Sequence, residues 1–213
     1  MSLLDFWSVR LTAVCVIVFV LQLAVPQLTD AITLVAADAL ARPWIFLTSM
    51  FAHGSFEHLF YNMFALALFG SILEKIIGCR RWLALFFVSG VAAGIAAAIF
   101  YPASLGASGA IFGLLGTLAV LRPRMTVWIA GVPMPMVIAA VVWAAGDLVG
   151  LFVPSGIANA AHLAGMALGI AAGLFWRKSF GEQLFDRRTK GPRITENEFQ
   201  TWERRWFNRA APT

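Results

Sequence analysis

The chain alternates between long apolar runs and short polar connections. Six apolar runs predict helices at residues 9–27, 56–74, 82–100, 107–121, 126–149 and 158–176. A helix rises about 1.5 Å per residue and a hydrocarbon core is about 30 Å thick, so each run can cross a membrane, the first and fourth with help from interfacial flanks. We therefore predict an all-α, polytopic membrane protein with six transmembrane helices.

The first run has one alternative interpretation. Arg10 precedes it, as a basic residue precedes the apolar core of a secretory signal peptide. The sequence Val25-Pro26-Gln27 offers no small-x-small cleavage site. A first transmembrane helix is therefore the favoured interpretation.

The connection between the first two predicted helices, residues 26–55, is long and mostly apolar. Asp30, Asp38 and Arg42 interrupt it at intervals too short for another span. We expect an interfacial, partly embedded loop rather than a seventh helix.

Composition agrees with a membrane protein. Hydrophobic residues make up 60% of the chain and the mean hydropathy is +0.80, well above soluble domains, which are about 45–50% apolar. Of 27 charged residues, 14 follow Trp176, so we expect a membrane domain at residues 1–176 and a basic cytoplasmic tail at 177–213. Anionic lipid headgroups would attract this tail, and no motif suggests nucleic-acid binding. Two cysteines cannot form a disulfide framework.

The distribution of basic residues predicts the orientation in the membrane. In a six-helix alternation, 15 of the 16 Lys and Arg residues fall on one side, and only Arg42 falls on the other. The cytoplasmic side of a membrane protein carries this excess. We predict a multi-pass protein of the cell (inner) membrane with both termini in the cytoplasm and the uncharged connections 101–105 and 152–156 facing outward.

Four polar side chains lie inside the predicted helices at one depth. His58 and Asn62 are one turn apart near the start of the second helix, Ser108 begins the fourth, and His162 is near the start of the sixth. Counted from the basic residues that mark the inner boundary, all four lie roughly 20–26 Å above it. Polar groups inside a membrane are costly, so we take these four as candidates for function.

Glycines recur along two of these helices: Gly109, Gly113 and Gly116 on the fourth, and Gly165, Gly169 and Gly173 on the sixth. Small residues let membrane helices approach closely, although such stripes also pack bundles without an active site. His162 precedes Gly165 by three residues and shares its helix face. We predict a close crossing that brings the imidazole to Ser108.

These side chains suit acyl transfer. Ser108 would be the nucleophile and His162 its general base, while His58, Asn62 and the Ser108 N–H at a helix N-terminus would stabilise an oxyanion. Such a site works without a carboxylate. Asp147, near the outer end of the fifth helix, is an alternative third member, but we favour a role in anchoring the adjacent loop.

Three ordered motifs resemble the rhomboid family of intramembrane serine proteases over residues 43–176. The motifs are His53-x4-His58-x3-Asn62, Gly106-x-Ser108-Gly109 and Ala161-His162-Leu-Ala-Gly165. The resemblance implies a six-transmembrane-helix rhomboid-like bundle of the minimal bacterial type. It implies an endopeptidase that uses a Ser108–His162 dyad, with His58 and Asn62 as oxyanion donors.

The resemblance also implies supporting roles and partners. His53, Gly106, Gly109 and Gly165 would be structural, and Phe112 would stack on the catalytic histidine where many members have a tyrosine. No cofactor or metal is implied. The expected partners are the lipid bilayer and single-span transmembrane substrates. These substrates would contain helix-weakening residues and be cut near the outer face of the membrane.

Three other functions fit less of the sequence. A zinc enzyme would use His53, His58 and His162, but no His-Glu-x-x-His motif is present. An inactive rhomboid-like scaffold would bind membrane helices without cleaving them. A transporter would need a pair of broken helices at the midplane, which the hydropathy pattern does not suggest.

Overall fold

The computed structural model describes residues 5–129, 131–153, 156–189, 197 and 201. The chain divides into two units, residues 1–178 and 179–213, which are described separately. In the second unit, helix α9 continues to Thr189, and the Thr201 hydroxyl donates to the Asn197 carbonyl at 2.6 Å. The rest of the predicted tail lies outside the described residues.

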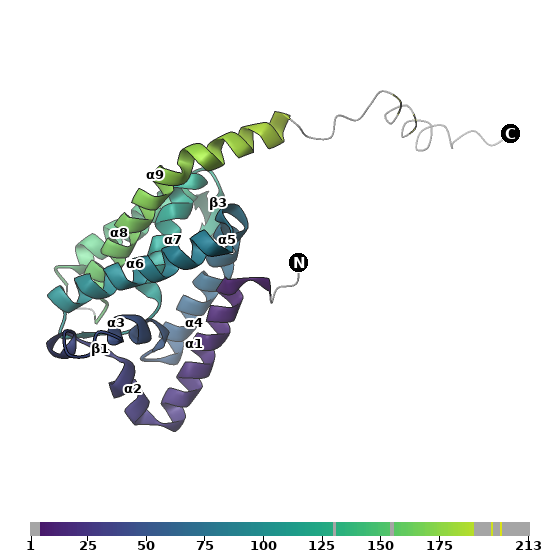
Figure 1. The fold of residues 1–213 in the computed structure, drawn as a ribbon. Coiled ribbons are helices and arrows are strands. Elements are labelled where there is room, and N and C mark those ends of the chain that lie inside the picture. The colour runs from purple at the N-terminus through teal and green to yellow at the C-terminus, as the bar shows by residue number, and fades with distance from the viewer. Residues whose placement is uncertain (1–4, 130, 154–155, 190–196, 198–200, 202–213) are drawn as a thin grey trace. The chain divides into compact units, whose positions relative to one another are not determined.

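The described part of the first unit is mostly helical (Figure 1). Its long elements are α1 (Trp7–Ala24), α4 (Phe56–Ala65), which continues through the π-helical η4 (Leu66–Gly70) into α5 (Ser71–Ile77), α6 (Cys79–Phe100), α7 (Ser108–Leu121), α8 (Met136–Gly150) and α9 (Asn159–Thr189). Four stretches are long and apolar enough to cross a membrane: Trp7–Ala24, Phe56–Ile77, Cys79–Phe100 and Asn159–Ser179. The shorter α7 matches the predicted fourth span, and α8 matches the second part of the predicted fifth. A mostly helical membrane protein is confirmed, while the count of six spans stays a prediction.

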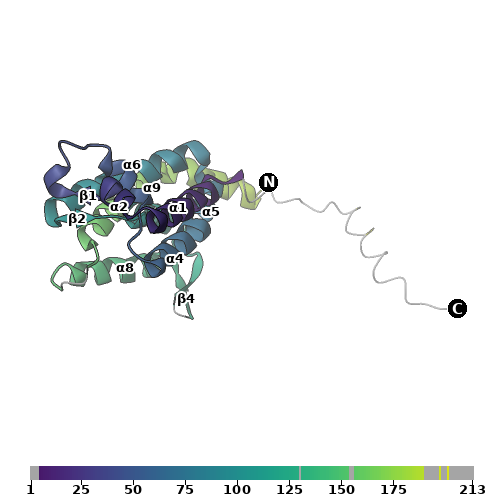
Figure 2. The ribbon, with the colours of Figure 1, turned by 90° about the horizontal axis from the view of Figure 1, so that it is seen from below.

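The prediction of a fifth helix over residues 126–149 is wrong for its first part, residues 126–135. Strands β3 (Thr126–Ile129) and β4 (Val132–Pro135) form an antiparallel hairpin there, next to α8 (Figure 2). Pro133 and Pro135 lack the N–H groups that a helix interior requires, and Gly131 turns the chain with a φ of 81°. Helix α8 therefore begins only at Met136.

The connection between α1 and α4 folds as a series of short elements. These are α2 (Pro26–Ile32), β1 (Leu34–Val35), η2 (Ala36–Asp38), α3 (Ile45–Thr48) and η3 (Ser49–Phe51). Strand β1 pairs antiparallel with β2 (Ala103–Ser104), with Leu34 opposite Ser104. This fully described connection contains no spanning helix, as predicted, and it is fastened to the segment that leads into α7.

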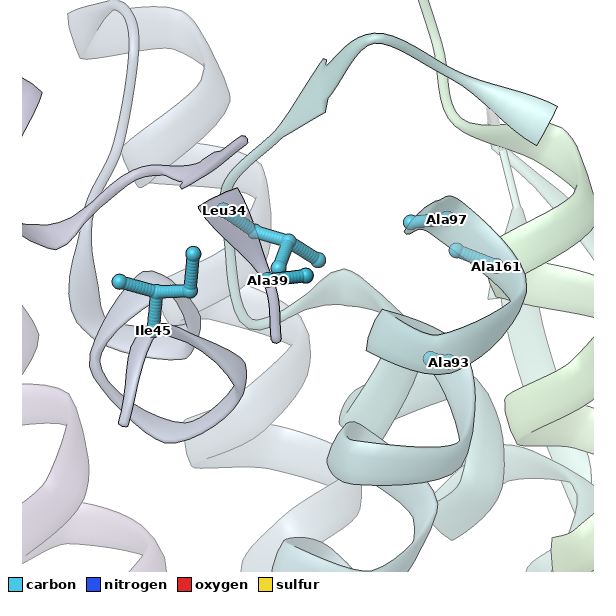
Figure 3. Packing of buried hydrophobic residues seen from close by; sticks show 6 residues of the cluster. All are labelled: Leu34, Ala39, Ile45, Ala93, Ala97 and Ala161. Atoms are coloured by element: carbon cyan, nitrogen blue, oxygen red, sulfur yellow. The ribbon is translucent and has the colours of Figure 1, made fainter. Parts of the chain in front are cut away.

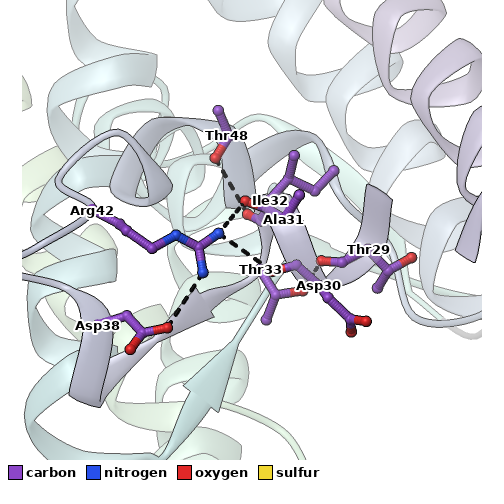
Figure 4. Close-up of polar contacts among 8 residues, drawn as sticks. All are labelled: Thr29, Asp30, Ala31, Ile32, Thr33, Asp38, Arg42 and Thr48. Atoms are coloured by element: carbon purple, nitrogen blue, oxygen red, sulfur yellow. Dashed lines mark hydrogen bonds and ion pairs between the residues drawn. The ribbon is translucent and has the colours of Figure 1, made fainter. Parts of the chain in front are cut away.

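Arg42 ties this connection together (Figure 4). Its guanidinium pairs with Asp38 at 3.3 Å and donates to the carbonyl oxygens of Ala31 at 2.5 Å and Asp30 at 3.4 Å. These carbonyls belong to the last turn of α2, where helix carbonyls lack partners within the helix. Arg42 thus caps the C-terminal end of α2 and links it to η2.

A small apolar cluster joins the connection to the helices (Figure 3). Its members are Leu34, Ala39 and Ile45 from the connection, Ala93 and Ala97 from α6, and Ala161 from α9. The alanines leave room for the larger side chains to reach the helix backbones. Ala161 precedes His162, so this packing also holds the first turn of α9.

Helices α7 and α9 cross in backbone contact. A Cβ atom built on Gly165 would overlap the Gly109 carbonyl, and one on Gly169 would overlap the Gly113 carbonyl. The Thr117 hydroxyl of α7 donates to the Gly169 carbonyl of α9 at 2.7 Å. The close crossing predicted from the glycine stripes is confirmed.

A buried carboxylate caps α1, which runs beside α4 (Figure 1). Glu74 on α5 accepts the N–H of Trp7 at 2.9 Å and the N–H of Ser8 at 3.0 Å. The first N–H groups of a helix have no partner within it, and the helix dipole favours a negative charge there. Glu74 therefore joins α5 to the start of α1.

Replacing this carboxylate should loosen α1. Glu74→Gln turns one acceptor into a donor that faces backbone N–H groups, and leaving such buried groups unpaired costs about 1–3 kcal/mol of unfolding free energy. Asp30→Asn, at an exposed position, removes the same charge and should cost less than about 0.5 kcal/mol. Thermal unfolding of the two variants in one detergent compares them, and equal midpoints would contradict the capping role.

Candidate active site

The close crossing of α7 and α9 at their glycines brings Ser108 and His162 together. Ser108 is the first residue of α7, and His162 lies in the first turn of α9. The His162 Nε2 atom is 2.8 Å from the Ser108 Oγ atom, within hydrogen-bonding range. Since Ser108 adjoins Gly109 and His162 shares a face with Gly165, the contact follows from the close approach of those two glycines.

Asp147 lies on the far side of the imidazole. Its Oδ1 atom is 3.0 Å from His162 Nδ1, and the side chains of His162 and Asp147 are only 12% and 9% exposed. The loop-anchoring role favoured from the sequence is not what this side chain does. Among the described residues its hydrogen-bonding partner is His162, because the C-terminal part of α8 lies against the first turn of α9.

The imidazole is also held by ring stacking. Phe112, one turn after Ser108 on α7, stacks on His162 with centroids 4.3 Å apart and planes 12° from parallel. The hydroxyl of Tyr101, at the end of α6, accepts the Ala160 N–H at 3.0 Å. The first turn of α9 is thus fixed by contacts from α6 and α7.

Gly106 is required by both backbone and space. Its φ is 118°, a region that residues with a Cβ rarely adopt. A Cβ built there would lie 2.7 Å from the His58 Cε1 atom. The Gly106 N–H donates to the Ser49 carbonyl at 2.8 Å, so η3 fixes the turn that leads into Ser108.

His58 and Asn62 line the same open cleft as Ser108 and His162, which has a volume of about 1680 Å³. Both come from α4, and the Asn62 side chain donates to the His58 carbonyl at 2.9 Å. A carboxamide carries two N–H groups, so Asn62 keeps a second donor for another acceptor. All four side chains predicted at one depth therefore face one space.

His53 lies behind His58 and is held by α1. The Gln22 side chain accepts the His53 N–H at 3.1 Å and donates to the His53 carbonyl at 3.3 Å. The His53 Nδ1–H donates to the Phe51 carbonyl at 3.2 Å, and burial lowers the pKa of His53 to about 4. A neutral His53 ring then meets the His58 ring edge-on, with centroids 5.1 Å apart.

Gln22 gives one weak signal in the sequence, because it is a polar residue inside an apolar run. The pattern does not reveal its partner His53, which lies 31 positions away.

Among the described residues, no group of three or more His, Cys, Asp and Glu side chains is placed to hold a metal ion. The three histidines do not gather into the zinc site considered from the sequence. The arrangement is a serine hydroxyl, a base and nearby donors at the wall of a cleft, which is the equipment of nucleophilic acyl transfer.

We compared the sequence with models of known protein families. The family model described as the Rhomboid domain matches residues 40–179. This range includes the cleft residues named above and begins within the connection between α1 and α4.

Curated proteins of several organisms are similar over much of the chain. Rhomboid protein 1, mitochondrial, of Saccharomyces cerevisiae is 32% identical over 149 residues, covering 63% of this chain and 42% of the yeast protein. Rhomboid protease GluP of Bacillus subtilis is 33% identical, covering 66% of this chain and 28% of its own. Rhomboid protease GlpG of Yersinia pseudotuberculosis is 31% identical, covering 62% and 48%. The chain thus spans less than half the length of these three relatives.

The two hydrogen bonds between the Gln22 side chain and the His53 backbone should stabilise the folded protein. Gln22→Leu leaves a buried N–H and carbonyl without partners, and we expect a loss of about 1–3 kcal/mol in unfolding free energy. Gln27→Leu is the matched control at an exposed position and should change it by less than about 0.5 kcal/mol. Thermal or chemical unfolding in detergent measures both, and a Gln22 variant as stable as its control would refute the assignment.

Proposed function

The chain belongs to the rhomboid family, and we propose that it is an intramembrane serine endopeptidase that cleaves transmembrane substrates near the outer membrane face through a Ser108–His162 dyad. The observation that carries this proposal is the 2.8 Å contact between Ser108 Oγ and His162 Nε2 at the wall of the cleft. A serine hydroxyl is a weak nucleophile until a neighbouring base accepts its proton. The relatives from Bacillus subtilis and Yersinia pseudotuberculosis are named rhomboid proteases, which supports the same activity.

The reaction begins with proton transfer. As Ser108 Oγ attacks the scissile carbonyl carbon, its proton passes to His162 Nε2, and the carbonyl oxygen becomes an oxyanion. The C–N bond then breaks, and the same Nε2–H proton passes to the leaving amine. Water hydrolyses the acyl-enzyme by the reverse sequence of transfers, with His162 again accepting a proton.

Three donors are available for the oxyanion. The Ser108 N–H stands at the N-terminus of α7, where the helix dipole favours negative charge. Asn62 and His58 reach the cleft from α4, and the absence of a side chain on Gly106 lets the His58 ring lie beside the turn before Ser108. Donors fixed in place before the reaction stabilise the charge without reorganising.

The substrate must present an extended peptide at this depth. Irregular backbone inside a membrane is tolerated only where protein or a water-filled cavity surrounds it, and the open cleft offers such a place. Single-span proteins with helix-weakening residues therefore suit the site, entering from the bilayer past α8. The connection 152–156, which we expect to face outward, includes residues 154 and 155, which lie outside the described part of the chain.

The proposed location is the cell (inner) membrane, with several spans and both termini in the cytoplasm. The distribution of basic residues supports this orientation, because 15 of the 16 fall on one side of a six-helix alternation. The catalytic side chains then lie nearer the outer face. No cofactor takes part in the proposed reaction.

Removing either member of the dyad should abolish cleavage. Ser108→Ala and His162→Ala should show no cleavage of a model transmembrane substrate in proteoliposomes, with thermal midpoints near that of the unchanged protein. Ser71→Ala is the matched control, because that hydroxyl donates to the Leu68 carbonyl in the adjoining η4, away from the dyad. Cleavage retained by either dyad variant would refute the mechanism.

A fluorophosphonate probe separates the enzyme from a helix-binding scaffold. The folded protein should react covalently at Ser108, and Ser108→Ala should not. A folded, unlabelled protein would favour the scaffold.

Loss of one oxyanion donor should slow turnover without preventing binding. Asn62→Ala should lower kcat by roughly 10²- to 10³-fold, with a smaller effect on KM. Asn197→Ala, in the second unit, is the control for the same side-chain change. A kcat within about threefold of the control would remove Asn62 from the oxyanion site.

A further inference from the structure

We propose that Asp147 is a positioning residue for this reaction, which holds His162 with its Nε2 lone pair directed at Ser108. The inference rests on the proposed function and extends its dyad by a carboxylate. It starts from two distances on one imidazole ring: 2.8 Å from Nε2 to Ser108 Oγ and 3.0 Å from Nδ1 to Asp147 Oδ1.

The first consequence concerns the tautomer of His162. A neutral imidazole carries one proton, and only its unprotonated nitrogen can accept another. An ionised carboxylate accepts hydrogen bonds and donates none, so the Asp147 contact places the proton on Nδ1. The Nε2 atom is then free to accept the Ser108 proton, as general-base catalysis requires.

Proton transfer from Ser108 also places a positive charge on His162. When the Ser108 proton reaches Nε2, His162 becomes an imidazolium ion in a place where its side chain is only 12% exposed. A buried charge is costly unless an opposite charge accompanies it. Asp147 supplies that charge within hydrogen-bonding distance. The Nδ1 proton of His162 donates to the carboxylate and stays on the imidazole throughout.

The local packing holds Asp147 in register with His162. Gly150 lies one turn after Asp147 on α8, and Asn159 lies three residues before His162 on α9. A Cβ built on Gly150 would lie 2.6 Å from the Asn159 side-chain nitrogen, so these two positions are already in contact. The two helices therefore meet at two adjacent levels, and the carboxylate–imidazole pair occupies one of them.

A structural role explains this carboxylate poorly. Asp147 as a whole residue is 7% exposed, and within the described residues its Oδ2 atom has no hydrogen-bond partner. A buried acceptor without a partner lowers stability, and a charged one in a membrane lowers it further. Retaining Asp147 at this cost is expected if it serves His162.

The test separates kcat from stability. Asp147→Asn keeps the shape, but its amide can donate to Nδ1 and select the tautomer that cannot accept the Ser108 proton; Asp147→Ala removes the group. In proteoliposomes with a model transmembrane substrate, both should lower kcat by about 10²- to 10⁴-fold. KM should stay within about threefold, and the thermal midpoint should be unchanged or higher. Leu148→Ala, at an exposed position of the same helix turn, is the control and should keep kcat within about twofold.

Two results would overturn the inference. One is a folded Asp147→Asn protein with a kcat within about threefold of the unchanged chain. The other is a loss of kcat matched by a fall in thermal midpoint, which would indicate a structural role. Ser108→Ala is measured alongside: if it still cleaves, the proposed function fails, whereas if it is inactive and Asp147→Asn is active, only the positioning role fails.

Discussion

The close crossing of α7 and α9 positions the other parts of the cleft. Lipid tails are as apolar as leucine, so membrane helices associate through tight packing rather than through the hydrophobic effect. Here Gly165 and Gly169 of α9 face the carbonyls of Gly109 and Gly113, leaving no room for a Cβ atom. Ser108 and His162 lie one turn or less from these contacts, so the hydrogen bond between them is a result of helix packing.

The surrounding elements hold irregular backbone beside this crossing. The turn at Gly106 is fixed by the Ser49 carbonyl and by the pairing of β1 with β2. His53 and His58 are supported from α1 through Gln22. Non-helical segments survive at membrane depth only when their polar groups find partners within the protein, and these contacts supply them. The connection between α1 and α4 is thus part of the site's support.

Apolar runs and rare polar residues predicted most of the membrane fold and the cleft-lining residues, because both signals are local. The β3–β4 hairpin was missed because Pro133, Pro135 and Gly131 stand in an apolar run whose hydropathy resembles that of a helix. The loop-anchoring role predicted for Asp147 does not match its contact with His162, and the sequence pattern does not reveal the contacts of Glu74. Their partners are 15 and 66–67 residues away, and such contacts depend on how each helix is rotated, which hydropathy does not report.

If backbone contact between α7 and α9 holds Ser108 beside its base, separating the two helices should make Ser108 less reactive. The most direct measurement is the rate at which a fluorophosphonate labels Ser108 in Gly165→Ala compared with Gly146→Ala, where an added Cβ meets nothing within 4 Å. Both are scored on folded protein with a cooperative thermal transition. Labelling at least about tenfold slower in Gly165→Ala, with Gly146→Ala unchanged, is the predicted result. Equal rates in the two folded variants would show that this helix contact does not make Ser108 reactive.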